Sequence, residues 1–293
     1  MAAPETTAPL ELAGAAAEPQ RRGGALTGSL AVTIPAGIIA FMVVFCFLGP
    51  TILGLPAPND GDILESNLPM FSPGHPFGTD QVGNDELSRL LHGGQASLEI
   101  AVAVNLLGLL IGGTLGAFAA YRGGRVDPII MRVLDVLIAF PSLVLALAIA
   151  QSLGPSKTNT IFALAFFSVA AFARIARAAT LQLREQTFMT AARLSGTPAW
   201  RTLVRHIAPN ILPGLITFAL LGMGIIIILE GALSFLGLGV PAPDPSWGNM
   251  ISNGQQTLSA TPRYVLLPSA FLFVTVLAFN LLGDALRSRW SVG

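Results

Sequence analysis

The sequence HIAPNILPGLITFALLGMGIIIIL, residues 206–229, contains no Asp, Glu, Lys or Arg. A helix rises about 1.5 Å per residue, so about 20 apolar residues cross the roughly 30 Å hydrocarbon core of a bilayer. Further uncharged intervals cover residues 23–59, 100–121, 136–156, 158–173 and 264–283. The sequence therefore predicts an all-α, polytopic membrane protein.

The composition agrees with a location in the bilayer. Of the 293 residues, 53% are hydrophobic and 11% are charged, against roughly 25% charged in soluble domains. So few charges cannot cover a water-exposed surface, which excludes a soluble enzyme or a nucleic-acid-binding domain. Lys+Arg and Asp+Glu balance, so net charge indicates no partner, and the single cysteine, Cys46, excludes an internal disulfide or a cysteine metal cluster.

Six transmembrane helices are predicted, at residues 29–50, 97–120, 130–152, 159–178, 211–236 and 265–285. The fourth is the weakest, because Arg174 and Arg177 shorten it, although arginine near a helix end can extend to the interface. Six spans place both termini on one side. That side receives thirteen arginines, namely Arg21, Arg22, Arg122, Arg125, Arg132, Arg174, Arg177, Arg184, Arg193, Arg201, Arg205, Arg287 and Arg289. The opposite side receives Arg89, Lys157 and Arg263, so the positive-inside rule places both termini in the cytoplasm.

These spans divide the chain into regions. Residues 1–28, rich in Ala, Pro, Glu and Gly, are predicted to be a disordered cytoplasmic tail. A cleaved signal peptide is the alternative, and three glutamates in this stretch argue against it. The remaining regions are the helix 29–50, an acidic extracytoplasmic loop 51–94, a five-helix core 95–285 and a C-terminal tail 286–293. Within the core, residues 240–262 are predicted to form a re-entrant stretch at the extracytoplasmic rim.

No catalytic or metal-binding motif is found. The only lysine, Lys157, does not follow a glycine as the lysine of a phosphate loop does. His75, His92 and His206 have neither metal-ligand spacing nor a partner nucleophile. Ser234 does not have the spacing of a nucleophile elbow. The sequence therefore predicts no enzyme activity, no metal site and no cofactor of its own.

The carboxylates of Asp135 and Glu230 lie inside predicted spans, where an unpaired charge costs a few kcal/mol. Asp135 could face a translocation path or pair with Arg132, one helical turn away. Glu230 has no cation within four residues, which favours a position facing a cavity or a subunit interface.

The cytoplasmic loop 179–208 carries most of the functional information. Its pattern predicts two short helices. Gly196 would end the first as a C-terminal cap, Thr197 would cap the second, and Pro198 would take its first helical position. Pro209 would end the second helix.

The second of these helices would be amphipathic. Its apolar positions are Trp200, Leu203, Val204 and Ile207, and its basic positions are Arg201 and Arg205. Small residues at Ala191, Ala192 and Gly196 would let a partner backbone approach closely. We interpret Gly196 as a buried bend, which favours docking into a protein groove. The alternative is a helix lying flat on anionic lipid.

Several sequence blocks resemble a known family. Residues 184–196 (REQTFMTAARLSG) and 205–210 (RHIAPN) resemble the coupling (EAA) loop of ABC importer permeases. Five more blocks look like the C-type permease of dipeptide, oligopeptide and nickel importers: HPFGTD at 75–80, YRGG at 121–124, LSFLGLG at 233–239, PSWG at 245–248 and FNLLGD at 279–284. Their order along residues 75–287 makes the resemblance specific.

The resemblance implies a type I ABC importer permease fold with a cytoplasmic coupling-helix loop, in the inner membrane of a bacterium. It implies a B-type permease partner, one or two cytoplasmic ATPase subunits that bind ATP and Mg²⁺, an extracytoplasmic substrate-binding protein, and contact with membrane lipid but not nucleic acid. The expected coupling residues are Ala191, Ala192, Arg193, Gly196, Thr197, Pro198, His206 and Pro209. Thr190 replaces the usual glutamate of the motif.

The function expected from the resemblance is ATP-driven import of dipeptides or oligopeptides, with hydrolysis in the partner subunits. Two alternatives stay open. One is a nickel or other small-solute importer of the same family. The other is a gradient-driven secondary transporter, which we would expect to carry more intramembrane charges than Asp135 and Glu230.

Overall fold

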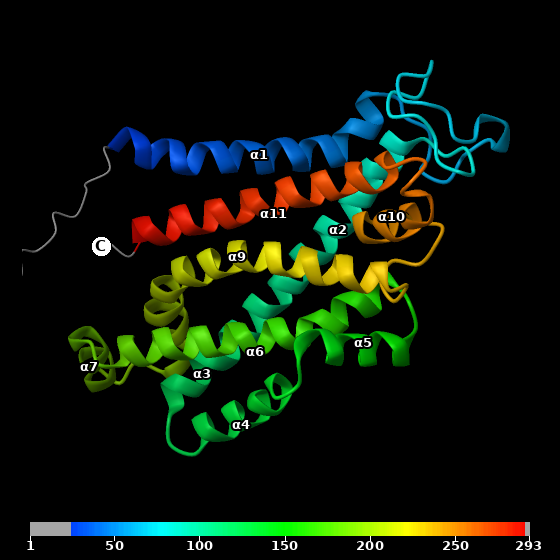
Figure 1. Ribbon diagram of the computed structural model, residues 1–293. Coiled ribbons are helices and arrows are strands. Elements are labelled where there is room, and N and C mark those ends of the chain that lie inside the picture. The colour runs from blue at the N-terminus through cyan, green and yellow to red at the C-terminus, as the bar shows by residue number, and fades with distance from the viewer. Residues whose placement is uncertain (1–24, 291–293) are drawn as a thin grey trace, which may run out of the picture.

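The computed structural model describes residues 25–290, and within this range the ordered elements are helices (Figure 1). In chain order they are α1 (Ala25–Ile52), η1 (Ile63–Glu65), α2 (Glu86–Leu107), η2 (Gly108–Gly112), α3 (Gly113–Arg122), α4 (Val126–Ile138), α5 (Ser142–Leu153), α6 (Lys157–Arg184), α7 (Thr187–Leu194), α8 (Ala199–Thr202), η3 (Leu203–Ile207), α9 (Ala208–Phe235), α10 (Trp247–Gly254), η4 (Gln255–Thr257) and α11 (Arg263–Trp290). The predicted all-α class is confirmed.

Five helical segments are long and apolar enough to cross a membrane: Ser29–Ile52, Glu86–Arg122, Lys157–Arg184, Ala199–Phe235 and Arg263–Arg289. A sixth span exists only if α4 and α5 are counted together, and these two helices meet at an angle of 81°. The span predicted at 130–152 corresponds to this bent pair and is not one continuous helix. Pro141 stands at the break. A proline lacks an N–H and disfavours helical geometry at the residue before it, so it interrupts the helix at this point.

Two predicted region boundaries also differ from the structure. The sequence predicts an extracytoplasmic loop at 51–94, whereas the chain between α1 and α2 is residues 53–85, because α2 begins at Glu86 with Asp85 as its N-cap. The Asp85 carboxylate accepts a hydrogen bond from the Ser88 amide at 2.6 Å. At the other end of the chain, residues 286–290 continue α11 and are not a tail. The tail predicted at 1–28 falls mostly on residues 1–24, which lie outside the described residues, as do 291–293.

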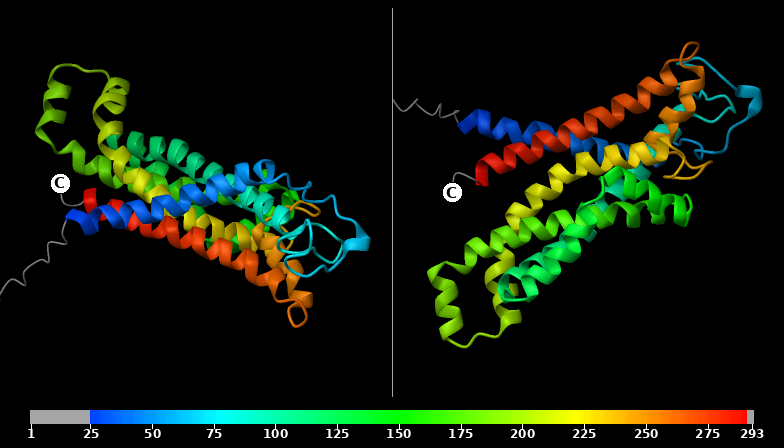
Figure 2. Two further views of the ribbon diagram at one scale, coloured as in Figure 1. Left: turned by 90° about the horizontal axis from the view of Figure 1, so that it is seen from above. Right: turned by 60° about the horizontal axis from the view of Figure 1, so that its bottom comes forward.

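The bundle has two distinct ends (Figures 1 and 2). The start of α1, the end of α11 and the short helix α7 lie at one end. The loop 53–85 and α10 lie together at the other. We call residues 185–207, between α6 and α9, the elbow, and we name the two ends the elbow end and the loop end.

Three glycines let two spans approach closely. Gly108, Gly112 and Gly116 recur every four residues, so they share one helix face. A Cβ atom added at Gly112 would lie 2.1 Å from the backbone oxygen of Val169, and one at Gly116 would lie 2.0 Å from that of Ala173. The α2–α3 segment therefore packs backbone against backbone on α6, as small-residue stripes permit in membranes.

At the loop end the turns are closed by polar contacts. His75 lies between Asp85 and Glu65, with nitrogen–oxygen distances of 2.8 Å and 3.2 Å. Burial lowers the pKa of His75, but the hydrogen bonds to the two carboxylates outweigh burial, so the pKa lies above its ordinary value. The histidine links η1 to the start of α2. Beneath the loop, the fully buried Trp247 donates its indole N–H to the Leu90 carbonyl at 3.0 Å and fixes α10 on α2.

Candidate functional site

The elbow has two arms, a first arm formed by α7 and a second formed by α8 and η3, and one buried side chain on each arm anchors it to the bundle. Met189 of α7 and Ile207 of η3 are both fully buried, in one cluster with Phe172 of α6 and Ile211 of α9. Burying an apolar side chain of this size contributes about 1.5–3 kcal/mol. The elbow is thus a packed structure that continues α6 and α9, although it stands off the bundle (Figure 2).

The first arm ends where the sequence predicts. Gly196 has φ +70°, the left-handed conformation that glycine adopts without steric cost. The Thr197 amide donates to the Ala192 carbonyl at 3.2 Å, which is the longer bond of a Schellman motif. The buried position expected for Gly196 is wrong, however. The glycine is exposed, and nothing lies within 4 Å of a Cβ built there.

The second arm differs from the prediction at both ends. Pro198, and not Thr197, is the N-cap of α8, and the Thr197 hydroxyl lies 3.1 Å from Ser195 Oγ. Pro209 does not end a helix, because the chain is helical from Ala199 to Phe235. The π-helical turn η3 immediately before Pro209 shifts the hydrogen bonding by one residue and accommodates the missing N–H. The side-chain amide of Asn210 donates to the His206 carbonyl at 2.6 Å.

Four large apolar side chains of the elbow are exposed. Leu194 is 85% exposed, Trp200 62% and Val204 60%, and Phe188 is also exposed. The apolar face predicted for the second arm is thus divided, since Ile207 points into the bundle while Trp200 and Val204 point outward. Exposed apolar side chains in this number on one short segment are typical of an interaction site, and we call these four residues the apolar patch of the elbow.

The predicted coupling residues lie on both sides of this segment. Ala191, Gly196, Pro198 and Pro209 are exposed, whereas Thr197 and His206 are partly buried. Ala192 is only 9% exposed, so it supports the arm from within and does not offer its surface to a partner. The Arg193 side chain lies outside the described part of the structure. The basic residues Arg201 and Arg205 are both exposed, and the guanidinium carbon of Arg201 lies 5.6 Å from the centre of the Trp200 ring.

Asp135 has a different partner from the one considered in its own helix. Its carboxylate accepts a hydrogen bond from Arg174 of α6 at 2.6 Å, so the pairing with Arg132 is wrong. One turn from Arg174, Arg177 binds Asp127 through two hydrogen bonds, of 2.6 Å and 2.7 Å. The two pairs join α4 to α6 across a groove of about 590 Å³. The spacing of residues along one helix could not predict these two ion pairs, because the arginines belong to α6 and the aspartates to α4.

Glu230 lies in the interior of the subunit. It is 0% exposed, and its two oxygens accept hydrogen bonds from Ser97 of α2 and Ser234 of α9, both at 2.7 Å. The structure therefore does not place Glu230 on a surface that faces a cavity or a second subunit. Two hydroxyl donors satisfy the carboxylate there, and Glu230 joins α2 to α9.

The chain is similar in sequence to permease proteins of bacterial transport systems. Residues 112–291 match the family described as binding-protein-dependent transport system inner membrane component. The chain is 39% identical to a glutathione transport system permease protein of Pectobacterium atrosepticum over 257 residues, which cover 87% of this chain and 85% of that one. It is 38% identical to a probable D,D-dipeptide transport system permease protein of Escherichia coli, over 89% of this chain and 87% of that one.

Other relatives are similar in sequence or in fold. A dipeptide transport system permease protein of Alkalihalophilus pseudofirmus is 41% identical over 73% of this chain and 70% of its own. Among solved structures, a methionine ABC transporter in an inward-facing conformation aligns with a TM-score of 0.56 at 15% identity, covering 70% of this chain and 96% of that one. At this identity the likeness concerns the fold alone.

Proposed function

Because the chain belongs to the family of binding-protein-dependent transport system inner membrane components, we propose that it forms half of the translocation path of an ATP-driven importer of short peptides. A second, B-type permease supplies the other half, and an extracytoplasmic binding protein delivers the substrate. Relatives named for dipeptide and glutathione transport support this substrate class. ATP and Mg²⁺ bind in the partner ATPase subunits, one or two per complex, and not in this chain.

The exposed apolar patch of the elbow carries the proposal. Leu194, Trp200 and Val204 are too exposed to contribute to the packing of this chain. Burial against a partner protein would remove this apolar area from water and stabilise the complex. The elbow end also carries the arginines that the positive-inside rule assigns to the cytoplasm. We therefore place the docking site of the ATPase on the elbow, on the cytoplasmic side.

The packing of the elbow suggests how docking is coupled to transport. Displacement of the elbow is transmitted to α6 and α9, because Met189 and Ile207 are buried between them. The α9 segment is helical from the elbow to Phe235, and Glu230 near its far end binds Ser97 of α2. Closure of the ATPase would therefore tilt α9 and α2 together and change access at the loop end. Cargo passage would follow from this movement of the two permeases relative to each other.

Uptake by reconstituted vesicles tests the function. We expect labelled alanyl-alanine to accumulate only when the second permease, the ATPase subunits, the binding protein and ATP are all present. Omission of the ATPase subunits is the control. Accumulation driven by a proton or sodium gradient without those subunits would contradict the proposal and identify a secondary transporter.

A further inference from the structure

A cavity of about 750 Å³ lies at the loop end, and the function of the elbow does not involve it. Its walls come from the start of α2, from the loop residues 80–84 and from the segment 234–250 after α9. The volume lies within the range of about 300–1,000 Å³ that small-molecule sites occupy. We call this cavity the loop-end pocket.

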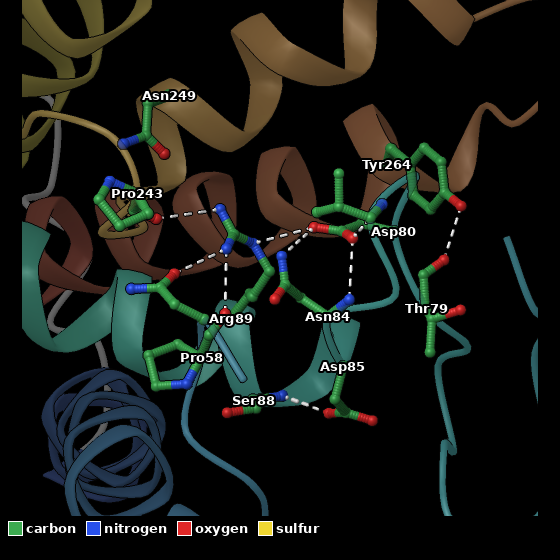
Figure 3. Close-up of polar contacts among 12 residues, drawn as sticks. Pro58, Thr79, Asp80, Asn84, Asp85, Ser88, Arg89, Pro243, Asn249 and Tyr264 are labelled. Atoms are coloured by element: carbon green, nitrogen blue, oxygen red, sulfur yellow. Dashed lines mark hydrogen bonds and ion pairs between the residues drawn. The ribbon is translucent and has the colours of Figure 1, made fainter. Parts of the chain in front are cut away.

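The pocket is lined by three carboxylates and one basic side chain. The carboxylates belong to Asp80, Glu86 and Asp244, and the cation is Arg89. Figure 3 shows Arg89 between the loop and the segment that follows α9. Its guanidinium donates to the Pro58 carbonyl and to Asn59 Oδ1, both at 3.0 Å, and lies 3.5 Å from Asp80. Arg89 therefore connects the walls of the pocket, and its guanidinium already donates hydrogen bonds to them.

Two of the carboxylates are also engaged. Asp80 Oδ1 accepts from the Val82 and Asn84 amides, both at 2.9 Å, and Oδ2 accepts from the Asn84 side chain (Figure 3). Asp244 accepts from Asn59 at 3.1 Å and is exposed. Both groups add negative charge to the pocket, but neither lacks a hydrogen bond.

Glu86 is the exception. Its side chain lines the pocket, the residue is only 4% exposed, and Oε2 is buried without a hydrogen-bond partner. Arg263 is the other nearby cation, and its guanidinium donates instead to the Leu68 carbonyl at 2.5 Å. An unpartnered buried carboxylate oxygen costs about 1–3 kcal/mol or more, so an incoming donor would be stabilised there. Rotation of the carboxyl group about its last bond can present either oxygen to the pocket.

We propose that the loop-end pocket binds the protonated amino group of a peptide substrate, with Glu86 as its acceptor. A positively charged donor satisfies both the missing hydrogen bond and the excess of three carboxylates over one arginine. The acidic loop end would also attract cations from solution. This inference rests on the proposed function, because it assigns the peptide a first contact on the permease itself.

The test measures access to the pocket with no binding protein present. Val82 lines the pocket and is 54% exposed, so the variant Val82→Cys in the assembled permease–ATPase complex provides a site for a maleimide. The native Cys46 is buried and 0% exposed. We expect alanyl-alanine to slow the labelling of residue 82, and N-acetyl-alanyl-alanine, which lacks the ammonium group, to leave its rate unchanged. Labelling unaffected by either peptide would overturn the proposal.

Substitution at Glu86 identifies the acceptor. Loss of one charge-assisted hydrogen bond is expected to raise the alanyl-alanine concentration that gives half protection by about tenfold in Glu86→Gln. Asp60→Asn is the matched control, because Asp60 is an exposed carboxylate of the same loop outside the pocket lining. Equal protection in Glu86→Gln and the unsubstituted chain would overturn the assignment.

Two further measurements separate this proposal from its rivals. Methylammonium alone should protect residue 82, since it carries only the recognised group. Protection by the binding protein without peptide, and not by peptide, would show that a protein side chain occupies the pocket and would overturn the proposal. ATP-driven uptake is measured on the same preparation. Absence of uptake there counts against the proposed function, whereas normal uptake without peptide protection counts against the pocket alone.

Discussion

Replacing Gly112 with valine is expected to prevent stable packing of the α2–α3 segment on α6. A Cβ atom at this position would lie 2.1 Å from the Val169 carbonyl oxygen, which is backbone and cannot rotate away. The two helices would have to separate, and the contacts of Gly108 and Gly116 with α6 would be lost with them. We expect destabilisation of about 3 kcal/mol or more, a shift of at least about a hundredfold in the folded population. Thermal unfolding of the purified subunit in detergent measures this.

Gly113→Val is the matched control for Gly112→Val. A Cβ at Gly113 meets Leu215 Cδ1 at 3.5 Å, which is ordinary van der Waals contact. Because the two glycines are adjacent in one helical segment, helix propensity and the unfolded chain change equally in both variants. Unfolding of both variants at the same temperature would mean that the close approach of the helices does not determine stability.

Replacing Gly196 with valine is expected to uncouple transport while leaving the subunit in the membrane. The surrounding space is open, so the effect comes from the backbone, which has φ +70°. The left-handed conformation costs a residue with Cβ about 1–2 kcal/mol, and more with a branched side chain. The turn would relax to another geometry, and the exposed side chains of Leu194 and Trp200 on either side of it would change position relative to each other. We expect substrate-stimulated ATP hydrolysis and uptake to fall by about tenfold.

Gly54→Val provides the same strain at the other end of the molecule. Gly54 has φ +61° and open space around its Cβ position, and it lies beyond the end of α1. Uptake should be nearly unchanged in this variant. Full uptake by Gly196→Val, or equal losses in the two variants, would contradict a specific role for the elbow turn.

The sequence predicts the parts of the fold that depend on the properties of one helix at a time. Uncharged runs locate the spans, and the glycine after Leu194 locates the end of α7. Predictions fail where a contact with a second helix determines the partner of a side chain. The cation beside Asp135 comes from α6, and the donors to Glu230 include Ser97 of α2. Neither contact leaves a periodic signal in the sequence.

Other failures have local causes. Charge-free intervals could not place the start of α2, because its first turn carries Glu86 and Arg89, which are buried beneath the loop 53–85. Proline marks a helix break at Pro141 but not at Pro209, where the preceding π-helical turn accommodates it. The spacing of Gly108, Gly112 and Gly116 was visible in the sequence and is the signal that could have predicted the close contact with α6.

The loop-end pocket could not be predicted from the sequence. Its carboxylates come from segments that are more than 150 residues apart, Asp80 and Glu86 on one side and Asp244 on the other. Only the folded chain shows which of them lacks a hydrogen bond. For the elbow, the sequence predicted the segment and its turn, while the structure identifies the exposed residues.

Crosslinking from the elbow tests the central claim most directly. Leu194→Cys places a thiol at a position that is 85% exposed on the elbow, and Leu64→Cys places one at a 91% exposed position on the loop end. In membranes that contain the complete complex, a short bifunctional reagent should join residue 194 to the ATPase subunit and leave residue 64 unjoined to it. A transport-active complex in which residue 194 reacts only with lipid-phase reagents, and never with the ATPase, would contradict the account.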